Sequence, residues 1–180
     1  MSVFLRIIGI VNAAIWFGAG AFFAFGVIPG VFSQDLRAIF VGEGAYPYYS
    51  GAVAMALFKR FFVLQYICGT VAIAHLIAEK LYLGRPFSRI GTTLVIIIFA
   101  LGLAGGFWMQ PKMEKLRSEW YSTKATPEMK EQAHHTFNVW HGISQTANVL
   151  IIGGLLIHLL RVTRSPDSRN YGVLFPQFRG

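Results

Sequence analysis

The sequence is poor in the residues from which most catalytic and metal sites are built. Its 180 residues include one cysteine, Cys68, and only eight aspartate and glutamate residues. A single cysteine excludes an internal disulfide, and the shortage of acids and thiols argues against a metal site. No glycine-rich phosphate loop follows a predicted strand, and no repeat with a period of 20–50 residues is apparent. We therefore expect neither a nucleotide-binding protein nor a solenoid.

Charged residues of both signs are also scarce, at 13% of the chain, whereas hydrophobic residues make up 54%. Soluble domains contain about 45–50% apolar residues. The formal net charge is +8, but the 16 lysine and arginine residues are spread over predicted helix ends and loops. This distribution indicates attraction to anionic lipid head groups in a bilayer, and it does not favour nucleic-acid binding.

Four apolar runs are long enough to cross a membrane as helices. They predict an all-α fold, a four-helix up-down bundle in residues 1–162 followed by a tail of residues 163–180. The membrane spans are expected at about residues 7–28, 61–80, 90–108 and 139–161. Because Thr126-Pro127-Glu128 is a good helix start, the fourth helix should be about 54 Å long, more than the roughly 30 Å of hydrocarbon. Helices three and four should therefore project from one membrane face as a hairpin.

Two polar stripes run along the predicted spans. One, on the fourth helix, recurs at spacings of three, four and three, with a serine at its edge; its residues are Asn138, His141, Ser144, Gln145 and Asn148. The other runs from Gln65 to Glu79 on the second helix. Lipid offers no hydrogen-bond partner, so each stripe should face protein or water. We interpret them as two seams that the bundle covers and pairs together, with a ligand or ion site near His141 as the alternative.

The histidines allow a second interpretation. His75 and His158 lie near the ends of predicted helices two and four and should be at similar depth. Two histidines from different helices could hold a b-type haem through its axial positions. The competing interpretation is a structural histidine bonded to a carbonyl or a neighbouring acid. Ser144 lies three residues from His141, but no acid is close enough in sequence to orient that imidazole, so we expect no enzyme and no metal.

Several segments resemble a known family. The first half contains Trp16-Phe-Gly-Ala-Gly-Ala-Phe-Phe-Ala and Phe58-Lys-Arg-Phe-Phe, and the second contains Phe137-Asn-Val-Trp-His-Gly-Ile-Ser-Gln followed by Asn148. Together these resemble the transmembrane-protein-205-like group of four-helix membrane proteins, over about residues 10–160. The resemblance implies four membrane helices. Because the biochemical activity of that group is not established, it implies no mechanism.

These patterns favour a non-catalytic accessory or scaffold subunit of a larger membrane complex, with a bioenergetic complex as one candidate. The tail, residues 163–180, carries interspersed aromatic residues and is the expected contact with other subunits. The alternatives are a haem- or ligand-binding membrane protein and a small transporter or channel lined by the two stripes. We expect a bacterial inner membrane with both termini in the cytoplasm.

Overall fold

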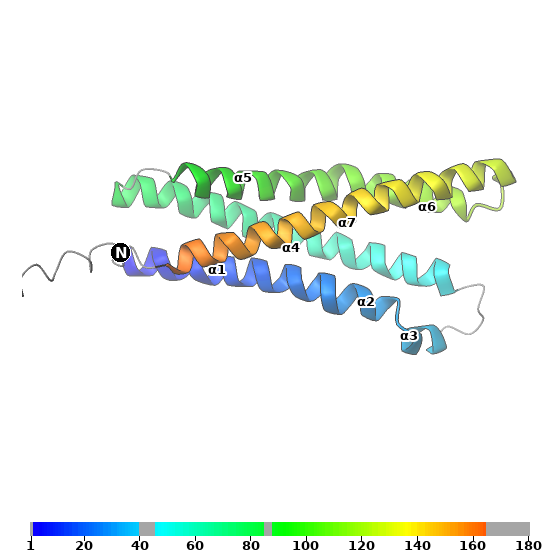
Figure 1. Ribbon diagram of the computed structural model, residues 1–180, viewed down its shortest axis with the longest axis horizontal. Helices are drawn as coiled ribbons and strands as arrows, with labels where there is room; N and C mark the ends of the chain where they lie inside the picture. Colours follow the sequence, from blue (N-terminus) through cyan, green and yellow to red (C-terminus); the bar gives the residue numbers. More distant parts are fainter. Residues whose placement is uncertain (1, 40–45, 85–87, 165–180) are drawn as a thin grey trace, which may run out of the picture.

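The computed structural model describes residues 2–39, 46–84 and 88–164, and within these ranges the chain is helical without strands. Four long antiparallel helical segments make up the molecule (Figure 1). The first comprises α1 (Ser2–Phe22), the π-helix η1 (Phe23–Val27) and α2 (Ile28–Val31), and a short α3 (Gln34–Ile39) follows it. The others are α4 (Tyr46–Leu83), then α5 (Arg89–Ala104) with the π-helix η2 (Gly105–Met109) and α6 (Gln110–Trp120), and finally α7 (Pro127–Thr163).

Each of the four segments is long and apolar enough to cross a membrane. The predicted all-α fold with four membrane-spanning helices is therefore confirmed. The tail of residues 163–180 is the expected contact with other subunits. Almost all of it, residues 165–180, lies outside the described residues.

The starts of α5 and α7 follow from their capping residues. Thr126 Oγ1 accepts a hydrogen bond from the Met129 amide at 3.3 Å, and Pro127 occupies the first turn, as its fixed φ angle favours. Hydrogen bonds from its own backbone N–H and from the Thr126 hydroxyl lower the pKa of the Glu128 carboxyl. At α5, Ser88 Oγ accepts from the Gly91 amide at 3.4 Å.

At one end of the molecule, the helices extend beyond the thickness of a bilayer. With 38 residues in α4 and 37 in α7, these helices are about 55 Å long at 1.5 Å per residue. Helix α6 packs along the first part of α7, as the predicted hairpin requires. The start of α4 joins them, because Arg117 Nη1 donates to the Tyr48 carbonyl at 2.9 Å and Gln110 Nε2 to the Met55 carbonyl at 3.2 Å. Three helices, rather than two, form this projecting end.

The order of the helices around the bundle decides which faces are covered. Helix α1 packs against α4 and α7, and α5 packs against the same two helices, so that α4 and α7 lie on a diagonal. The buried apolar core lies where all four helices meet and consists of Trp16, Cys68, Ala72, Val95, Ile98 and Leu155. Away from this core, α2 and α3 diverge from α7 toward the projecting end (Figure 1).

The polar stripe of α4 packs against α1, so the interpretation that it pairs with the stripe of the fourth helix was wrong. The Trp16 indole N–H donates to Gln65 Oε1, and Asn12 Nδ2 donates to the Cys68 carbonyl at 3.0 Å. All four of these residues are buried. The physical reason is that α1 carries its own buried polar groups on the face that meets α4, whereas α4 and α7 are diagonal neighbours. Each hydrogen bond removes two polar groups from contact with lipid.

Both π-helices directly precede a proline-containing helical turn. In η1 the bond is from the Ile28 amide to the Phe23 carbonyl, just before Pro29. In η2 it is from the Gln110 amide to the Gly105 carbonyl, just before Pro111. Proline lacks an N–H and its ring clashes with the carbonyl four residues earlier, so a widened turn accommodates it within a continuous helix.

The two π-helices flank one aromatic segment of α4. Phe23 stacks on Phe61 with ring centroids 4.3 Å apart, and Phe107 stacks on Tyr66 at 5.1 Å. A Cβ atom added at Gly106 would overlap the Tyr66 side chain, so only glycine fits this close approach. The aromatic segment thereby connects the first, second and third membrane helices.

The Trp16–Gln65 hydrogen bond yields a stability prediction. Gln65→Leu leaves the indole N–H buried without a partner, so we expect the free energy of unfolding in detergent to fall by about 1–2 kcal/mol. A double-mutant cycle with Trp16→Phe should give a coupling of about 0.6–1.7 kcal/mol. Circular dichroism during denaturation measures both values. Purely additive effects would show that the two side chains do not interact.

Candidate functional site

The polar stripe of α7 lies mostly on the outer surface of the bundle. The core-facing side of this helix is fixed by Leu155, which is fully buried, and by Gly154, where an added Cβ atom would lie 2.9 Å from Ile98. On the stripe, Asn138, His141 and Gln145 are exposed, whereas Ser144 and Asn148 are half-buried. The expectation that the other helices cover this stripe was therefore wrong. The apolar side of the same helix is the one that packs into the core.

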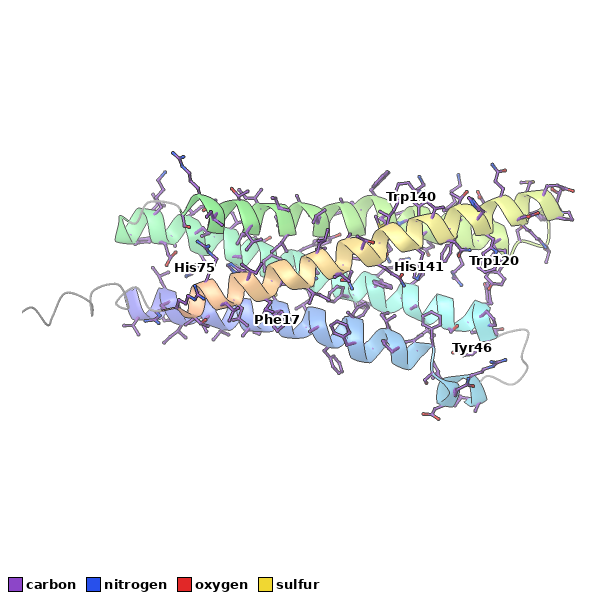
Figure 2. All side chains as sticks on the ribbon, viewed as in Figure 1. Phe17, Tyr46, His75, Trp120, Trp140 and His141 are labelled. Atoms are coloured by element: carbon purple, nitrogen blue, oxygen red, sulfur yellow. The ribbon has the colours of Figure 1, made fainter. Side chains whose placement is uncertain are left out.

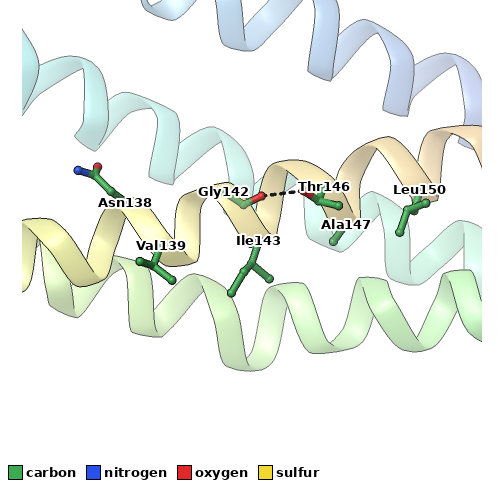
Figure 3. Close-up of a pocket in the computed structure, with 7 residues that line it drawn as sticks. All are labelled: Asn138, Val139, Gly142, Ile143, Thr146, Ala147 and Leu150. Carbon is green, nitrogen blue, oxygen red and sulfur yellow. Dashed lines mark hydrogen bonds between the residues drawn. The ribbon is translucent and has the colours of Figure 1, made fainter.

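A shallow open groove of about 530 Å³ runs along three turns of α7 beside the polar stripe and shares only Asn138 with it (Figure 3). It is lined by Asn138, Val139, Gly142, Ile143, Thr146, Ala147 and Leu150. A Cβ atom added at Gly142 would have no atom of the surrounding structure within 4 Å, and the same holds about three turns further on at Gly153. Small residues on an open helix face allow the backbone of another helix to come close. We call the exposed set Asn138, Gly142, Gln145, Thr146 and Gly153 the α7 outer face.

The polar groups of the α7 outer face bond only within their own helix. Gln145 Nε2 lies 3.0 Å from His141 Nε2, and Asn138 Nδ2 lies 3.2 Å from His134 Nε2. Thr146 Oγ1 donates to the Gly142 carbonyl at 3.1 Å. None of these hydrogen bonds connects α7 to another helix.

Aromatic residues mark the depth of His141. Trp108 and Trp140 meet edge-to-face at 5.0 Å, and Lys112 Nζ lies 3.8 Å from the centre of the Trp140 ring. Tryptophan and lysine of this kind are typical of a membrane interface. From His141 to Arg161, at the opposite end of α7, is about 30 Å at 1.5 Å per residue, the thickness of the hydrocarbon region. Gln145, Thr146 and Asn148 thus lie within the membrane, and His141 lies at its boundary.

Beyond this boundary, an aromatic cluster joins α6 and α7. His134 stacks on Trp120 with ring centroids 3.9 Å apart, and His141 stacks on Phe137 at 5.8 Å. Figure 2 places Trp120 and His141 toward the projecting end and His75 at the other end. Next to Trp120, burial raises the pKa of the Tyr121 phenol, and the nearby Arg117 partly offsets this. No sequence pattern predicted this cluster, although aromatic residues on both sides of the predicted turn were an available signal.

His75 near the end of α4 and His158 near the end of α7 lie at the same end of the bundle, as the two helices run in the same direction (Figure 2). His75 Nε2 donates to the Leu5 carbonyl at 2.8 Å. The imidazole ring also packs closely on Gly9, where an added Cβ atom would lie only 2.7 Å from the ring. His158 is buried with its ring edge-to-face against Trp16. Iron ligation through His75 Nε2 would require breaking its bond to Leu5, so these contacts favour structural histidines. The haem site stays a prediction.

Two other hypotheses from the sequence, a metal site and a channel lined by both polar stripes, depend on which side chains come together. Among residues 2–39, 46–84 and 88–164, no three histidine, cysteine, aspartate or glutamate side chains come together as a metal-binding group. The stripe from Gln65 packs under α1, whereas the stripe from Asn138 faces outward. The two stripes therefore do not line one common path through the bundle.

The fold and the four apolar helices define this chain as an integral membrane protein of the four-helix type. It belongs to the family described as a domain of unknown function (DUF4149), whose model matches residues 11–122. This match covers most of α1 and continues through α6, and it ends before α7. No curated protein and no solved structure matches the chain. The resemblance to the transmembrane-protein-205-like group stays a prediction, and its histidine-containing segment lies outside the matched residues.

The position of the α7 outer face yields a second stability prediction. Asn138→Leu and Gln145→Leu replace exposed side chains that bond only within α7, so each should change the free energy of unfolding of the isolated chain by less than about 0.5 kcal/mol. The same measurement on Gln65→Leu provides the buried comparison. A loss at Gln145 as large as the loss at Gln65 would mean that the outer stripe holds the bundle together.

Proposed function

We propose that this protein is a non-catalytic accessory or scaffold subunit of a larger membrane complex, and that it binds a neighbouring subunit through the α7 outer face. The observation that supports this most is the exposure of polar groups at membrane depth. Gln145 and Thr146 lie within the span, yet no other helix of the bundle covers them. Lipid tails cannot satisfy these groups, whereas a protein helix can.

The shape of the face supports a helix as the binding partner. Gly142 and Gly153 are open, and Thr146 between them is small, so a second backbone can approach closely along about three turns. Hydrogen bonds across such contacts contribute only about 0.6 kcal/mol each on average. Close packing therefore supplies most of the affinity, and the polar groups of Asn138 and Gln145 determine the register of the two helices.

The projecting end gives the same partner a second place to bind. The start of α4 carries Tyr48 and Tyr49, both exposed, beside Arg117 of α6. Tyrosine and arginine are enriched where proteins bind one another. The tail remains an additional expected contact, but its residues lie outside the described part of the chain.

The cellular setting is part of the proposal. We place the complex in a bacterial inner membrane, with a bioenergetic complex as a candidate, and both termini in the cytoplasm.

Co-purification with matched glycine variants tests the proposal. Gly142→Leu fills the groove, and we expect it to lower the yield of co-purified subunits from digitonin-solubilised native membranes by about tenfold, equivalent to about 1.4 kcal/mol. Gly18→Leu is the control, since Gly18 is an exposed glycine of α1 that also has nothing within 4 Å of an added Cβ. Circular dichroism should show that both variants are fully helical.

Two outcomes would contradict this assignment. The first is wild-type protein that leaves its native membrane only as this single chain, without other subunits. The second is a stable complex from which Gly142→Leu and Gly18→Leu remove partners to the same extent, because the α7 outer face would then not be the binding surface.

A further inference from the structure

The end opposite the projecting helices carries a corner rich in arginine. Arg89 begins α5, Arg161 lies in the last turn of α7, and Arg164 ends that helix. All three side chains are exposed. Among the described residues, none of the three pairs with a carboxylate, and Glu79 is the only acid of this part of the molecule at this end. Within residues 2–39, 46–84 and 88–164, no carboxylate thus neutralises the positive charge of these three side chains.

One hydrogen bond holds the corner together. Arg161 Nη2 donates to Ser88 Oγ at 3.0 Å, and Arg161 Nε lies 3.8 Å from the place of an added Cβ at Gly91. The guanidinium of Arg161 is therefore fixed along the first turn of α5, and the residue that it bonds, Ser88, directly precedes Arg89. A guanidinium has five N–H donors, so this bond leaves others available to an anion.

Apolar side chains lie directly on the membrane side of these charges. Ile90 follows Arg89 and is 68% exposed, while Ile157 and Leu160, one turn or less before Arg161, are 52% and 50% exposed. A ligand that fits both features carries a negative charge at its head and hydrocarbon below it. This combination distinguishes a lipid from a free anion in solution.

We propose that Arg89, Arg161 and Arg164 bind the phosphate of one anionic glycerophospholipid at the corner between α5 and α7. The acyl chains of that lipid lie along the exposed isoleucine and leucine side chains of the same two helices. The bound lipid bridges α5 and α7 at the membrane surface and neutralises their charge. This site is separate from the α7 outer face, and it does not depend on the proposed function.

Lipid titration of the full-length protein in dodecyl maltoside tests this site, with bound lipid counted by native mass spectrometry. Wild-type protein should bind phosphatidylglycerol more tightly than phosphatidylcholine with the same acyl chains. The double variant Arg89→Gln/Arg164→Gln keeps the Arg161–Ser88 bond, so the bundle should remain intact. Its dissociation constant for phosphatidylglycerol should rise about 25-fold, because the loss of each arginine weakens binding about fivefold.

A matched control removes the same charge elsewhere. Lys124→Gln/Lys130→Gln takes two cations from the projecting end and should change the dissociation constant less than about twofold, since they lie several Debye lengths from the corner. Equal binding of the two lipids, or equal loss in the two double variants, would overturn the proposal. Complete displacement of phosphatidylglycerol by inorganic phosphate would also overturn it, because the ligand would then be a soluble anion.

Discussion

The structure depends on one constraint, that lipid tails cannot hydrogen-bond the polar side chains of a membrane helix. The contact between α1 and α4 satisfies this constraint completely. Trp16 and Asn12 of α1 donate to Gln65 and to the Cys68 carbonyl of α4, and the groups involved are buried. The register of the first two helices is therefore fixed by polar bonds, and the remaining helices pack around this pair through apolar side chains.

On α7 the exposed polar side chains meet the same constraint only through hydrogen bonds within their own helix. Its Leu155 side packs into the core, which turns Gln145 and Thr146 outward at membrane depth. The open glycines beside them provide space for another helix. A bundle with an uncovered polar face at membrane depth offers a surface that a helix of another chain is able to cover. This is the physical basis of the proposed accessory role.

The sequence predicted where the helices lie along the chain better than it predicted which helices pack against each other. Apolar length and the Thr126 cap were sufficient for the four helices and the start of α7, because these features are local. Periodicity showed that Gln65 and His141 belong to polar stripes, but it could not show which helix each stripe meets. That choice depends on the packing of all four helices, in which α1 and α5 each contact both α4 and α7, so that α4 and α7 are diagonal. The stacking of His134 on Trp120 likewise results from a contact between two helices.

Photocrosslinking in intact native membranes tests the central claim most directly. The photoreactive residue benzoylphenylalanine would be placed at Thr146 on the α7 outer face, and separately at Ile67, an exposed residue of α4 within the span. We predict a covalent adduct with another polypeptide from position 146, and adducts with lipid alone from position 67. An absence of any polypeptide adduct from position 146, while both variants are inserted and photoreactive, would contradict the account.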